Sequence, residues 1–407
     1  ITLTAAERHR LKALAYSHRQ LSLSIASVTS LLADLPDQAH TVCWLPLANP
    51  FQRITNWCAM AANWKTFMVS EPAKILEQVR EIRPHFLVAV PRFYEKLHAG
   101  IRRRLEAMPG RLKSAAGWAQ DVGARYWRAA ARGEQVPLSL KCKHRLADRL
   151  VLRRVRRAMG GRLRYFISGS APLSASLIDA FAALGWPILE AYGISENIIP
   201  MAMNAPGACC PGSVGRPLAN NEIRIAGDGE ILVKGPGVAV ASADPQADGF
   251  LKTGDLGVLD DEGFLRITGR KSDIFKLSTG RKIVPRPLEE ALGRIDGVEH
   301  CVAVGASRKF VVALLNVPDE QWRRLNEQHA GAEGARVFLR RRAQQVCAHL
   351  PDYSRPVEVA VVNECFSPQG GELTANLKLR RDFVLRKHAD VIEEIYRCDA
   401  AGVIEVT

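Results

Sequence analysis

Residues 163–196 decide the fold of this 407-residue chain, and they read LRYFISGSAPLSASLIDAFAALGWPILEAYGISE. Residues 163–168 are apolar and partly aromatic, which is typical of a buried strand, and the small and polar residues 169–172 then break that strand. Five apolar residues follow at the spacing of one helix face: Leu173, Leu177, Ile178, Phe181 and Leu184. Gly185 ends this helix before a short strand at residues 188–192. The stretch therefore predicts a β-α-β unit.

The turns that follow the two predicted strands carry polar and flexible residues. Ligands of an open parallel sheet bind beyond the carboxyl ends of its strands, so we expect both turns at one cleft. The turn Gly169-Ser170-Ala171-Pro172 would let a flat ring approach the backbone, and Tyr192 offers a face for stacking. Ser195 adds a hydroxyl group, and Glu196 adds a carboxylate that suits Mg²⁺. Either turn alone is ordinary loop chemistry, but together they indicate a nucleotide site.

Length and composition indicate a globular protein of two or more domains, because 47% of the residues are apolar and suffice for sizeable cores. No apolar run reaches the roughly 20 residues of a membrane span, so we expect a cytoplasmic location. The nine cysteines lack the spacing of a zinc site or a disulfide framework, which indicates reduced thiols. The formal net charge of +14 suits anionic ligands.

The motif Tyr192-Gly193-Ile194-Ser195-Glu196 resembles the YGxTE signature of the adenylate-forming (AMP-binding) superfamily, with Ser in place of Thr. Residues 90–96, VPRFYEK, resemble the VPRVYEKI phrase of long-chain fatty acyl-CoA synthetases. Residues 44–53 resemble the segment LPLxHxFER, which helps to shape the acyl pocket of that family, although Asn49 replaces its histidine. The resemblance favours long-chain fatty acids over acetate or amino acids as substrates.

The resemblance also implies the domain organisation. We expect an α/β adenylate-forming fold with a truncated large domain at residues 1–271, in which residues 205–270 form a small β-barrel subdomain. A smaller and mobile α/β domain would follow at residues 272–407. The family hinge lies at its GRKSD phrase, here Lys271-Ser272, where Ser272 replaces the usual Asp or Lys. The short hydroxyl side chain should still permit rotation of the second domain.

Three further site residues follow from this resemblance. Asp255, in a Thr-Gly-Asp sequence, matches the carboxylate that binds both ribose hydroxyls, and its paired acceptors suit two vicinal donors. Arg270 matches the residue that contacts ribose and phosphate. Lys378 lies in residues 371–381, GELTANLKLRR, and matches the catalytic lysine. The resemblance also implies which residues at the ends of the two predicted strands would contact the nucleotide. They are Gly169, Ser170, Ala171, Pro172, Tyr192 and Gly193.

The chain departs from the family pattern at the phosphate loop YTSGTTGxPKG. Residues 4–13 read TAAERHRLKA and keep Thr4 and Lys12 but no glycine. Consecutive backbone N–H groups wrap a phosphate when glycines allow it, so we expect no such cradle here. Roughly the first third of the usual family length is also missing upstream, which predicts an incomplete adenylate-forming enzyme.

The predicted activity is the activation of a fatty acid by ATP with Mg²⁺ and its transfer to CoA. The alternatives are a ligase that loads an acyl carrier protein and a catalytically degenerate AMP-binding homologue. Residues 101–164 are densely basic and form either a solvated helix face or a peripheral contact with an anionic membrane. No aromatic interleaving or reading motif accompanies this charge, so we expect no nucleic acid partner.

Overall fold

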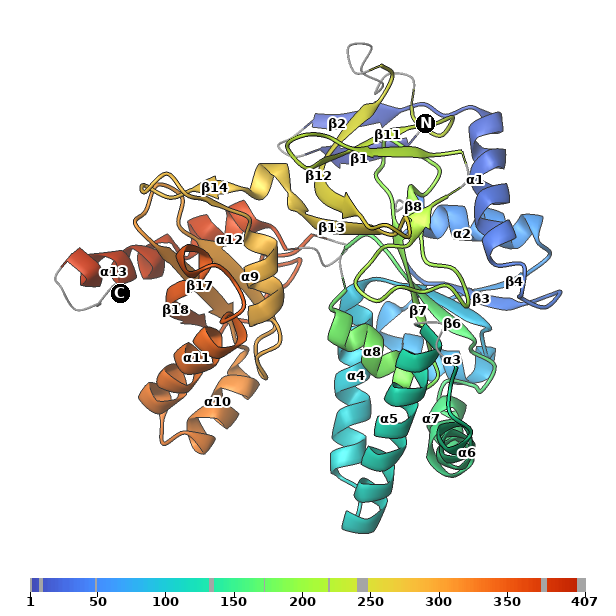
Figure 1. Ribbon diagram of the computed structural model, residues 1–407, viewed down its shortest axis with the longest axis horizontal. Coiled ribbons are helices and arrows are strands. Elements are labelled where there is room, and N and C mark those ends of the chain that lie inside the picture. Colours follow the sequence, from blue (N-terminus) through green and yellow to red (C-terminus); the bar gives the residue numbers. More distant parts are fainter. Residues whose placement is uncertain are drawn as a thin grey trace. The chain divides into compact units, whose positions relative to one another are not determined.

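The computed structural model describes residues 2–6, 10–47, 50–131, 135–171, 173–218, 220–239, 248–374 and 379–400. The chain divides into two compact units (Figure 1). The first unit comprises residues 1–253 and 257–267, and the second comprises residues 254–256 and 268–407. The polypeptide passes between the units within two strands, β12 (Leu251–Leu259) and β13 (Leu265–Arg270).

The first unit is built on a sheet of order β5-β6-β7-β8-β9. Its strands are β5 (Phe86–Ala89), β6 (Tyr165–Ser168), β7 (Ile188–Tyr192), β8 (Ala202–Met203) and β9 (Arg216–Pro217). The first three strands are parallel, and β8 and β9 continue the sheet in antiparallel fashion. Helix α8 (Ala175–Ala183) connects β6 to β7, which confirms the predicted β-α-β unit.

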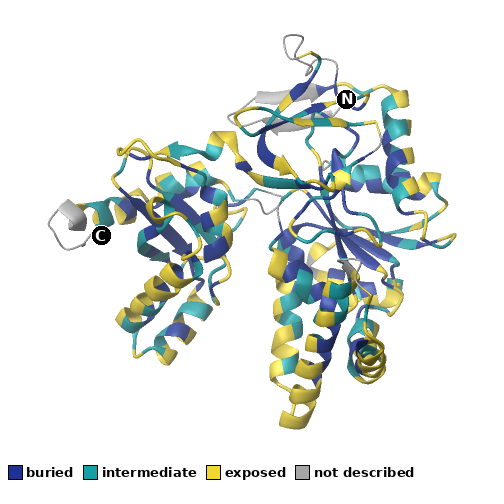
Figure 2. Cartoon of the chain, in the orientation of Figure 1, coloured by how far each residue is buried: buried dark blue, intermediate teal, exposed yellow. Residues whose placement is uncertain are grey.

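Alternate residues of these strands enter two different cores, as the pleat of a strand requires. On one face, Leu87, Phe166 and Ile188 pack with residues of α4 (Pro91–Glu106), α5 (Gly110–Ala131) and α8. On the other face, Phe86, Ile167 and Leu189 pack with residues of α1 (His18–Leu31) and α2 (Pro50–Ala61). The strands are accordingly buried on both faces, whereas the covering helices show exposed outer residues (Figure 2).

Helix α1 begins where its sequence provides a capping box. The Ser17 side chain accepts from the Gln20 N–H, and the Gln20 side chain accepts from the Ser17 N–H. The sequence predicts a helix over residues 21–35 that Pro36 closes, but the cap starts the helix at His18, and the helix ends at Leu31. The sequence also predicts a strand over residues 41–45. The observed strand is β3 (His40–Cys43), which pairs in parallel with β4 (Lys65–Met68).

Several smaller elements complete the first unit. They are η1 (Pro72–Lys74), α3 (Ile75–Ile82), α6 (Leu138–Ala147), the π-helical segment η2 (Asp148–Leu152) and α7 (Arg153–Arg157). The sequence predicts strands over residues 222–225 and 230–234, and these are β10 (Glu222–Ile225) and β11 (Glu230–Lys234). They belong to a four-stranded sheet of order β10-β11-β12-β13. Strands β1 (Thr2–Ala6) and β2 (Arg10–Leu14) form an antiparallel hairpin in which Thr4 lies opposite Lys12.

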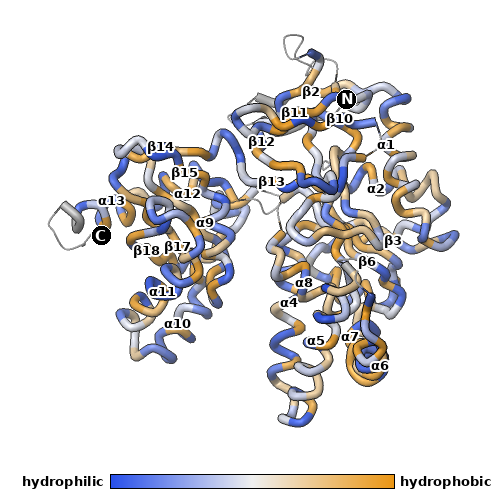
Figure 3. The backbone as a smooth tube through the Cα atoms, viewed as in Figure 1, coloured by the Kyte–Doolittle hydropathy of each residue, from blue (hydrophilic) through white to orange (hydrophobic). Residues whose placement is uncertain are grey.

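The second unit is a three-stranded sheet covered by helices on both faces. Its elements are η5 (Lys271–Asp273), β14 (Phe275–Lys276), β15 (Lys282–Ile283), α9 (Pro285–Leu292), β16 (His300–Val304), β17 (Val311–Asn316), α10 (Asp319–Gln328), α11 (Ala332–Val346), η6 (Asp352–Ser354), β18 (Pro356–Val362), α12 (Arg381–Lys387) and α13 (Ala389–Ala400). Strand β17 pairs with β16 in antiparallel and with β18 in parallel orientation. Its apolar run is visible in Figure 3, and it contributes to a core on each side. Across the described residues, no helix combines the length and the hydropathy that a membrane span requires.

Candidate active site

The two predicted turns lie at the same edge of the central sheet. Ser168, the last residue of β6, pairs with Glu190 of β7 in the parallel ladder. The backbone therefore brings residues 169–171 beside residues 192–196, as expected from the sequence. Pro172 lies outside the described residues.

The turn after β6 has a backbone that few side chains tolerate. Ser170 adopts a φ of 71°, in the left-handed region. A Cβ atom on Gly169 would lie 3.0 Å from Cζ of Phe51, so the ring of Phe51 packs directly on the Gly169 backbone. The buried hydroxyl of Ser168 has no hydrogen-bond partner within the part of the chain that the structure describes. The turn thus keeps its backbone close to an aromatic side chain of α2.

The turn after β7 combines a buried aromatic ring with two partly exposed polar residues. Tyr192 is 7% exposed and packs with Met201 and Ile231. Ser195 and Glu196 are half-buried. The carbonyl oxygen of Glu196 accepts a hydrogen bond of 2.8 Å from the N–H of Ala239. The loop that carries the predicted metal ligand is therefore tied to a neighbouring segment.

Helix α1 and the residue before its cap fix this loop from the other side. The Tyr16 hydroxyl donates to the carbonyl oxygen of Ser195. Burial, together with the nearby Glu196 carboxylate, raises the pKa of Tyr16 well above its usual value, so the phenol stays protonated and donates. The Ser24 hydroxyl donates to the carbonyl oxygen of Ile198 at 2.8 Å. Sequence reasoning missed Tyr16, whose partner is 179 residues away.

Gln20 extends this connection beyond its capping role. Its Nε2 donates to the carbonyl oxygens of Pro236 and Val238 at 2.8 and 3.1 Å. The N–H of Ile198 in turn donates to the carbonyl oxygen of Gly237 at 3.0 Å. The start of α1, the loop after β7 and residues 236–238 thus form one hydrogen-bonded assembly around the Glu196 position.

Asp255 and Arg270 form an ion pair in the second unit. Nε of Arg270 lies 3.1 Å from Oδ1 of Asp255, and the Asp255 side chain is 8% exposed whereas that of Arg270 is 45% exposed. Asp255 lies in β12 and Arg270 ends β13, so adjacent strands place the two residues together. The arrangement brings together the two residues to which the sequence assigns ribose contacts. That assignment stays a prediction.

Lys378 lies outside the described residues, but both ends of the segment that carries it are described. Leu373 and Leu379 form an isolated antiparallel bridge. The Glu372 side chain, which is 2% exposed, lies 2.7 Å from Nζ of Lys387. Burial alone would raise the pKa of Glu372, but the hydrogen bond from Lys387 and those from the backbone lower it overall. The base of the segment is thus fixed by a buried carboxylate.

The predicted hinge residues lie at the start of the second unit. Lys271 and Ser272 belong to the short helix η5, and the Ser272 hydroxyl lies 3.3 Å from Oδ1 of Asp273. The backbone leaves β13 at Arg270, immediately before this helix. The hinge role and the domain boundary between Lys271 and Ser272 stay predictions.

An apolar cavity of about 40 Å³ lies on the α1 and α2 face of the central sheet. Its walls are Val28, Leu32, Phe51, Ile54, Thr55, Cys58, Trp64, Phe86, Val88, Ile167, Ala191, Pro200 and Met203. Ile167 and Ala191 immediately precede the ends of β6 and β7, so the cavity adjoins both turns. Burial raises the pKa of the Cys58 thiol to about 12, which keeps this wall uncharged.

The described residues contain no cluster of three or more His, Cys, Asp or Glu side chains that could enclose a metal ion. Mg²⁺ in nucleotide enzymes commonly takes one or two protein carboxylates, and substrate phosphates and water complete its coordination. The half-buried Glu196 carboxylate beside the two turns fits a metal that arrives with a nucleotide.

Comparisons with known proteins agree on one family and one fold. Residues 10–241 match the AMP-binding enzyme family, and residues 272–400 match the AMP-binding enzyme C-terminal domain. The chain is 32% identical over 376 residues to long-chain-fatty-acid–CoA ligase FadD15 of Mycobacterium tuberculosis, covering 87% of this chain and 61% of that protein. It is 27% identical to human long-chain-fatty-acid–CoA ligase 1, covering 93% and 58%. The chain thus spans about three fifths of the length of these relatives.

Solved structures share the adenylate-forming fold. ATP-bound MatB from Rhodopseudomonas palustris superimposes with a TM-score of 0.67 at 22% identity, covering 96% of this chain and 68% of that one. MenE from Bacillus subtilis in complex with AMP gives a TM-score of 0.63 at 21% identity, covering 94% and 67%. The predicted mixed α/β fold with its second, smaller α/β domain is confirmed.

Proposed function

This chain belongs to the AMP-binding enzyme family, and from that premise we propose that it activates a long-chain fatty acid with ATP and transfers the acyl group to CoA. The apolar cavity beside the two turns carries this proposal, because it would hold the first methylenes after the carboxylate. Its walls offer an alkyl chain a dry surface, and its position next to residues 169–171 and 192–196 would leave the carboxylate at the nucleotide. The relatives named as long-chain-fatty-acid–CoA ligases support the same substrate class.

The proposed reaction has two half-reactions. In the first, a carboxylate oxygen attacks the α-phosphorus of ATP, the bond to the β-phosphate oxygen breaks, and pyrophosphate leaves. In the second, the CoA thiol loses its proton and its sulfur attacks the acyl carbon, and AMP leaves with the bridging oxygen. Both steps move negative charge onto phosphoryl oxygens, where nearby cations lower the barrier.

The residues of this chain would divide these tasks. Glu196 would hold Mg²⁺, which neutralises phosphate charge when bound. Ser195 would contact a phosphate, and Lys378 would neutralise charge in the first half-reaction. Asp255 and Arg270 would hold the ribose, and the 169–172 turn with Tyr192 and Gly193 would border the adenine. The hinge at Lys271-Ser272 would rotate the second unit between the two steps.

The test is incubation with labelled palmitate, ATP and Mg²⁺, with and without CoA. Palmitoyl-CoA and AMP in equal amounts are the expected products. Accumulation of palmitoyl adenylate with no thioester even when CoA is present would favour loading of an acyl carrier protein. The absence of both products would indicate a catalytically degenerate AMP-binding homologue. Residues 4–13 support this alternative, because they contain no glycine.

Lys378 provides a sharper version of this test. Lys378→Ala should slow adenylate formation far more than thioester formation from supplied palmitoyl adenylate, because its charge acts on the phosphates in one half-reaction only. Lys309→Ala, at an exposed lysine of the same unit, is the matched control. Equal losses in both half-reactions would contradict the assigned role.

We also propose that the face formed by α6, η2 and α7 contacts anionic lipid. Leu138, Leu146 and Leu150 are 79%, 52% and 48% exposed there, among exposed arginines such as Arg149 and Arg153. An amphipathic face of this kind binds through apolar insertion and through cations worth about 1 kcal/mol each. Sedimentation with phosphatidylglycerol vesicles should exceed that with phosphatidylcholine vesicles, and equal sedimentation would contradict the proposal.

A further inference from the structure

A second and larger cavity lies beside the apolar one. It measures about 290 Å³ and is lined by Ser27, Ser30, Leu31, Met203, Ala205, Ala208, Arg216, Pro217 and Leu218. Ser30, Ala208 and Arg216 are exposed and form its outer side, whereas Ser27, Met203 and Leu218 are buried and form its inner side. The larger cavity therefore reaches from the surface of the first unit to Met203.

Met203 borders both cavities. Among the described residues it alone lines both of them, and it is 4% exposed. Helix α1 and its C-cap residue Leu32 border both cavities, because Val28 and Leu32 line the small cavity while Ser27 and Leu31 line the large one. Met203 is thus shared by the 40 Å³ cavity, called the inner chamber, and the 290 Å³ cavity, called the outer chamber.

The inner chamber is too small for a long alkyl chain. A water-sized group requires roughly 10–15 Å³ of cavity volume, so the inner chamber accommodates only a few methylene-sized groups. The outer chamber is mostly apolar at Leu31, Met203, Ala205, Ala208, Pro217 and Leu218, and it provides the additional space. Methionine has flexible torsions and adapts to irregular gaps, so a rotamer change of Met203 would connect the two spaces.

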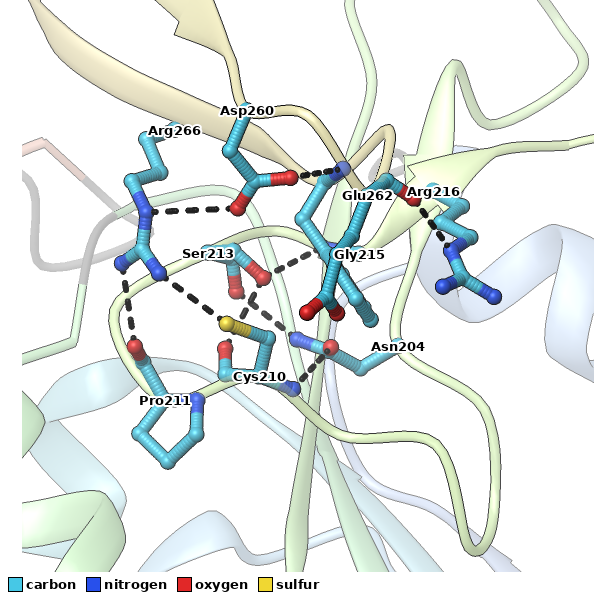
Figure 4. A network of polar contacts seen from close by, with 10 residues as sticks. Asn204, Cys210, Pro211, Ser213, Gly215, Arg216, Asp260, Glu262 and Arg266 are labelled. Atoms are coloured by element: carbon cyan, nitrogen blue, oxygen red, sulfur yellow. Dashed lines mark hydrogen bonds and ion pairs between the residues drawn. The ribbon is translucent and has the colours of Figure 1, made fainter. Parts of the chain in front are cut away.

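The wall of the outer chamber is held by a polar network, which Figure 4 shows in detail. Nδ2 of Asn204 donates to the carbonyl oxygen of Ser213 at 2.7 Å, and its Oδ1 accepts from the N–H of Cys210 at 3.1 Å. Nε of Arg216 donates to the carbonyl oxygen of Glu262 at 2.9 Å. These bonds fix the loop that carries Ala205 and Ala208. The chamber is therefore a built feature of the fold, with Met203 at its inner end.

We propose that Met203 is the gate between two sections of one acyl site, and that the outer chamber binds the distal methylenes of a long, unbranched fatty acid. The proposal rests on the proposed function and adds a residue that sets chain-length preference. A short chain would end at Met203, whereas a long chain would displace it. Each additional methylene that leaves water should then tighten binding about four-fold.

The test measures binding of butanoate, laurate and palmitate to the full chain by calorimetry. In the unmodified protein, affinity should rise from butanoate to palmitate. Met203→Trp, whose side chain is larger and stiffer, should weaken palmitate binding at least ten-fold and leave butanoate binding within about two-fold. Met203→Ala should keep or strengthen palmitate binding. Met159→Ala truncates another buried methionine, which lines neither chamber, and should leave the chain-length profile unchanged.

A second variant protects the test against misfolding of the tryptophan substitution. Ala208→Trp fills the outer chamber from its exposed side and should also weaken palmitate binding selectively, with Ala208→Ser as its matched control. Binding of all three acids with a profile that neither tryptophan changes would overturn the gate but not the proposed function. Failure of every fatty acid to bind would overturn both.

Discussion

At the scale of single residues, Asp255 permits a direct test of the nucleotide assignment. Asp255→Ala should lower the affinity for AMP at least ten-fold, because each hydrogen bond to a charged group contributes about 1.5–3 kcal/mol. Calorimetry with AMP measures this loss, and circular dichroism verifies that the chain still folds. Asp261→Ala, at an exposed residue of the turn between β12 and β13, is the matched control. Unchanged affinity in Asp255→Ala would refute the ribose contact.

Tyr16 permits a second residue-scale prediction. Tyr16→Phe removes the donor to the Ser195 carbonyl oxygen and should raise the Mg²⁺ concentration needed for half-maximal adenylation several-fold, since one hydrogen bond contributes about 0.5–1.5 kcal/mol. A metal titration of the adenylation rate provides the measurement. Tyr126→Phe, at a tyrosine stacked on His144, is the control and should require the same Mg²⁺ concentration as the unmodified chain. A loss of rate with no shift in the metal requirement would indicate a general structural effect.

The sequence anticipated the residues at the strand ends but not the residue that fixes them. Ser170 and Glu196 could be placed because they directly follow apolar runs whose pairing β-sheet geometry dictates. Tyr16 could not, because its contact with Ser195 depends on the docking of α1 across the sheet. Met203 was equally invisible, since a methionine in an apolar stretch carries no sign that two cavities meet at its side chain.

At the scale of elements, the contact between α5 and α8 is unusually close. A Cβ atom on Gly123 of α5 would lie 2.0 Å from the carbonyl oxygen of Ala183, whereas one on Gly117 of the same helix would meet nothing within 4 Å. Gly123→Ala should therefore destabilise the first unit by about 1–3 kcal/mol, because the helices must separate. Gly117→Ala should stabilise it by up to about 1 kcal/mol through helix propensity. Urea unfolding compares the two, and equal shifts would contradict the packing.

The pair formed by Glu372 and Lys387 makes the second unit sensitive to acid. The folded pKa of Glu372 lies below its unfolded value of about 4.3, so its stabilisation is complete above that pH and is lost as the pH falls through the folded pKa. Urea unfolding of the unmodified chain and of Glu372→Gln should show a stability difference near neutral pH that shrinks below about pH 4. A difference that stays constant with pH would exclude the carboxylate as its source.

The bounds of strands were predictable where apolar and polar residues alternate between two turns, or where a short apolar run lies between them. Strands β7, β10 and β11 have the expected bounds for this reason. Helix α1 was misplaced because an apolar pattern locates the face of a helix, whereas its first residue is fixed by the cap at Ser17. Helix α10 escaped prediction because it has one buried residue, Leu325, and otherwise carries mostly polar side chains.

At the scale of the whole molecule, the amino-terminal hairpin predicts the relative affinities of the chain for AMP and ATP. Strands β1 and β2 pair along their full lengths, so their backbone is engaged in a ladder and their sequence contains no glycine. We expect AMP to bind at least as tightly as ATP, and adenylation to be slow. Titrations of both nucleotides with Mg²⁺ measure the ratio.

Replacing residues 4–13 with a glycine-rich phosphate loop should shift that ratio toward ATP. A glycine-free replacement of equal length is the control and should leave the ratio unchanged. If the unmodified chain already prefers ATP and turns over rapidly, then side chains replace the missing backbone donors and the loop has not lost its function.

The long-range bonds of α1 also have a consequence for folding kinetics. Ser24 and Gln20 donate hydrogen bonds to partners 174 to 218 residues later in the chain, so these bonds form only after those residues have left the ribosome. Until then, α1 covers the face of the sheet that carries Phe86 and Ile167 without these bonds. We therefore expect this apolar surface to be incompletely protected during much of synthesis, and chaperone dependence and aggregation to be greatest at that stage.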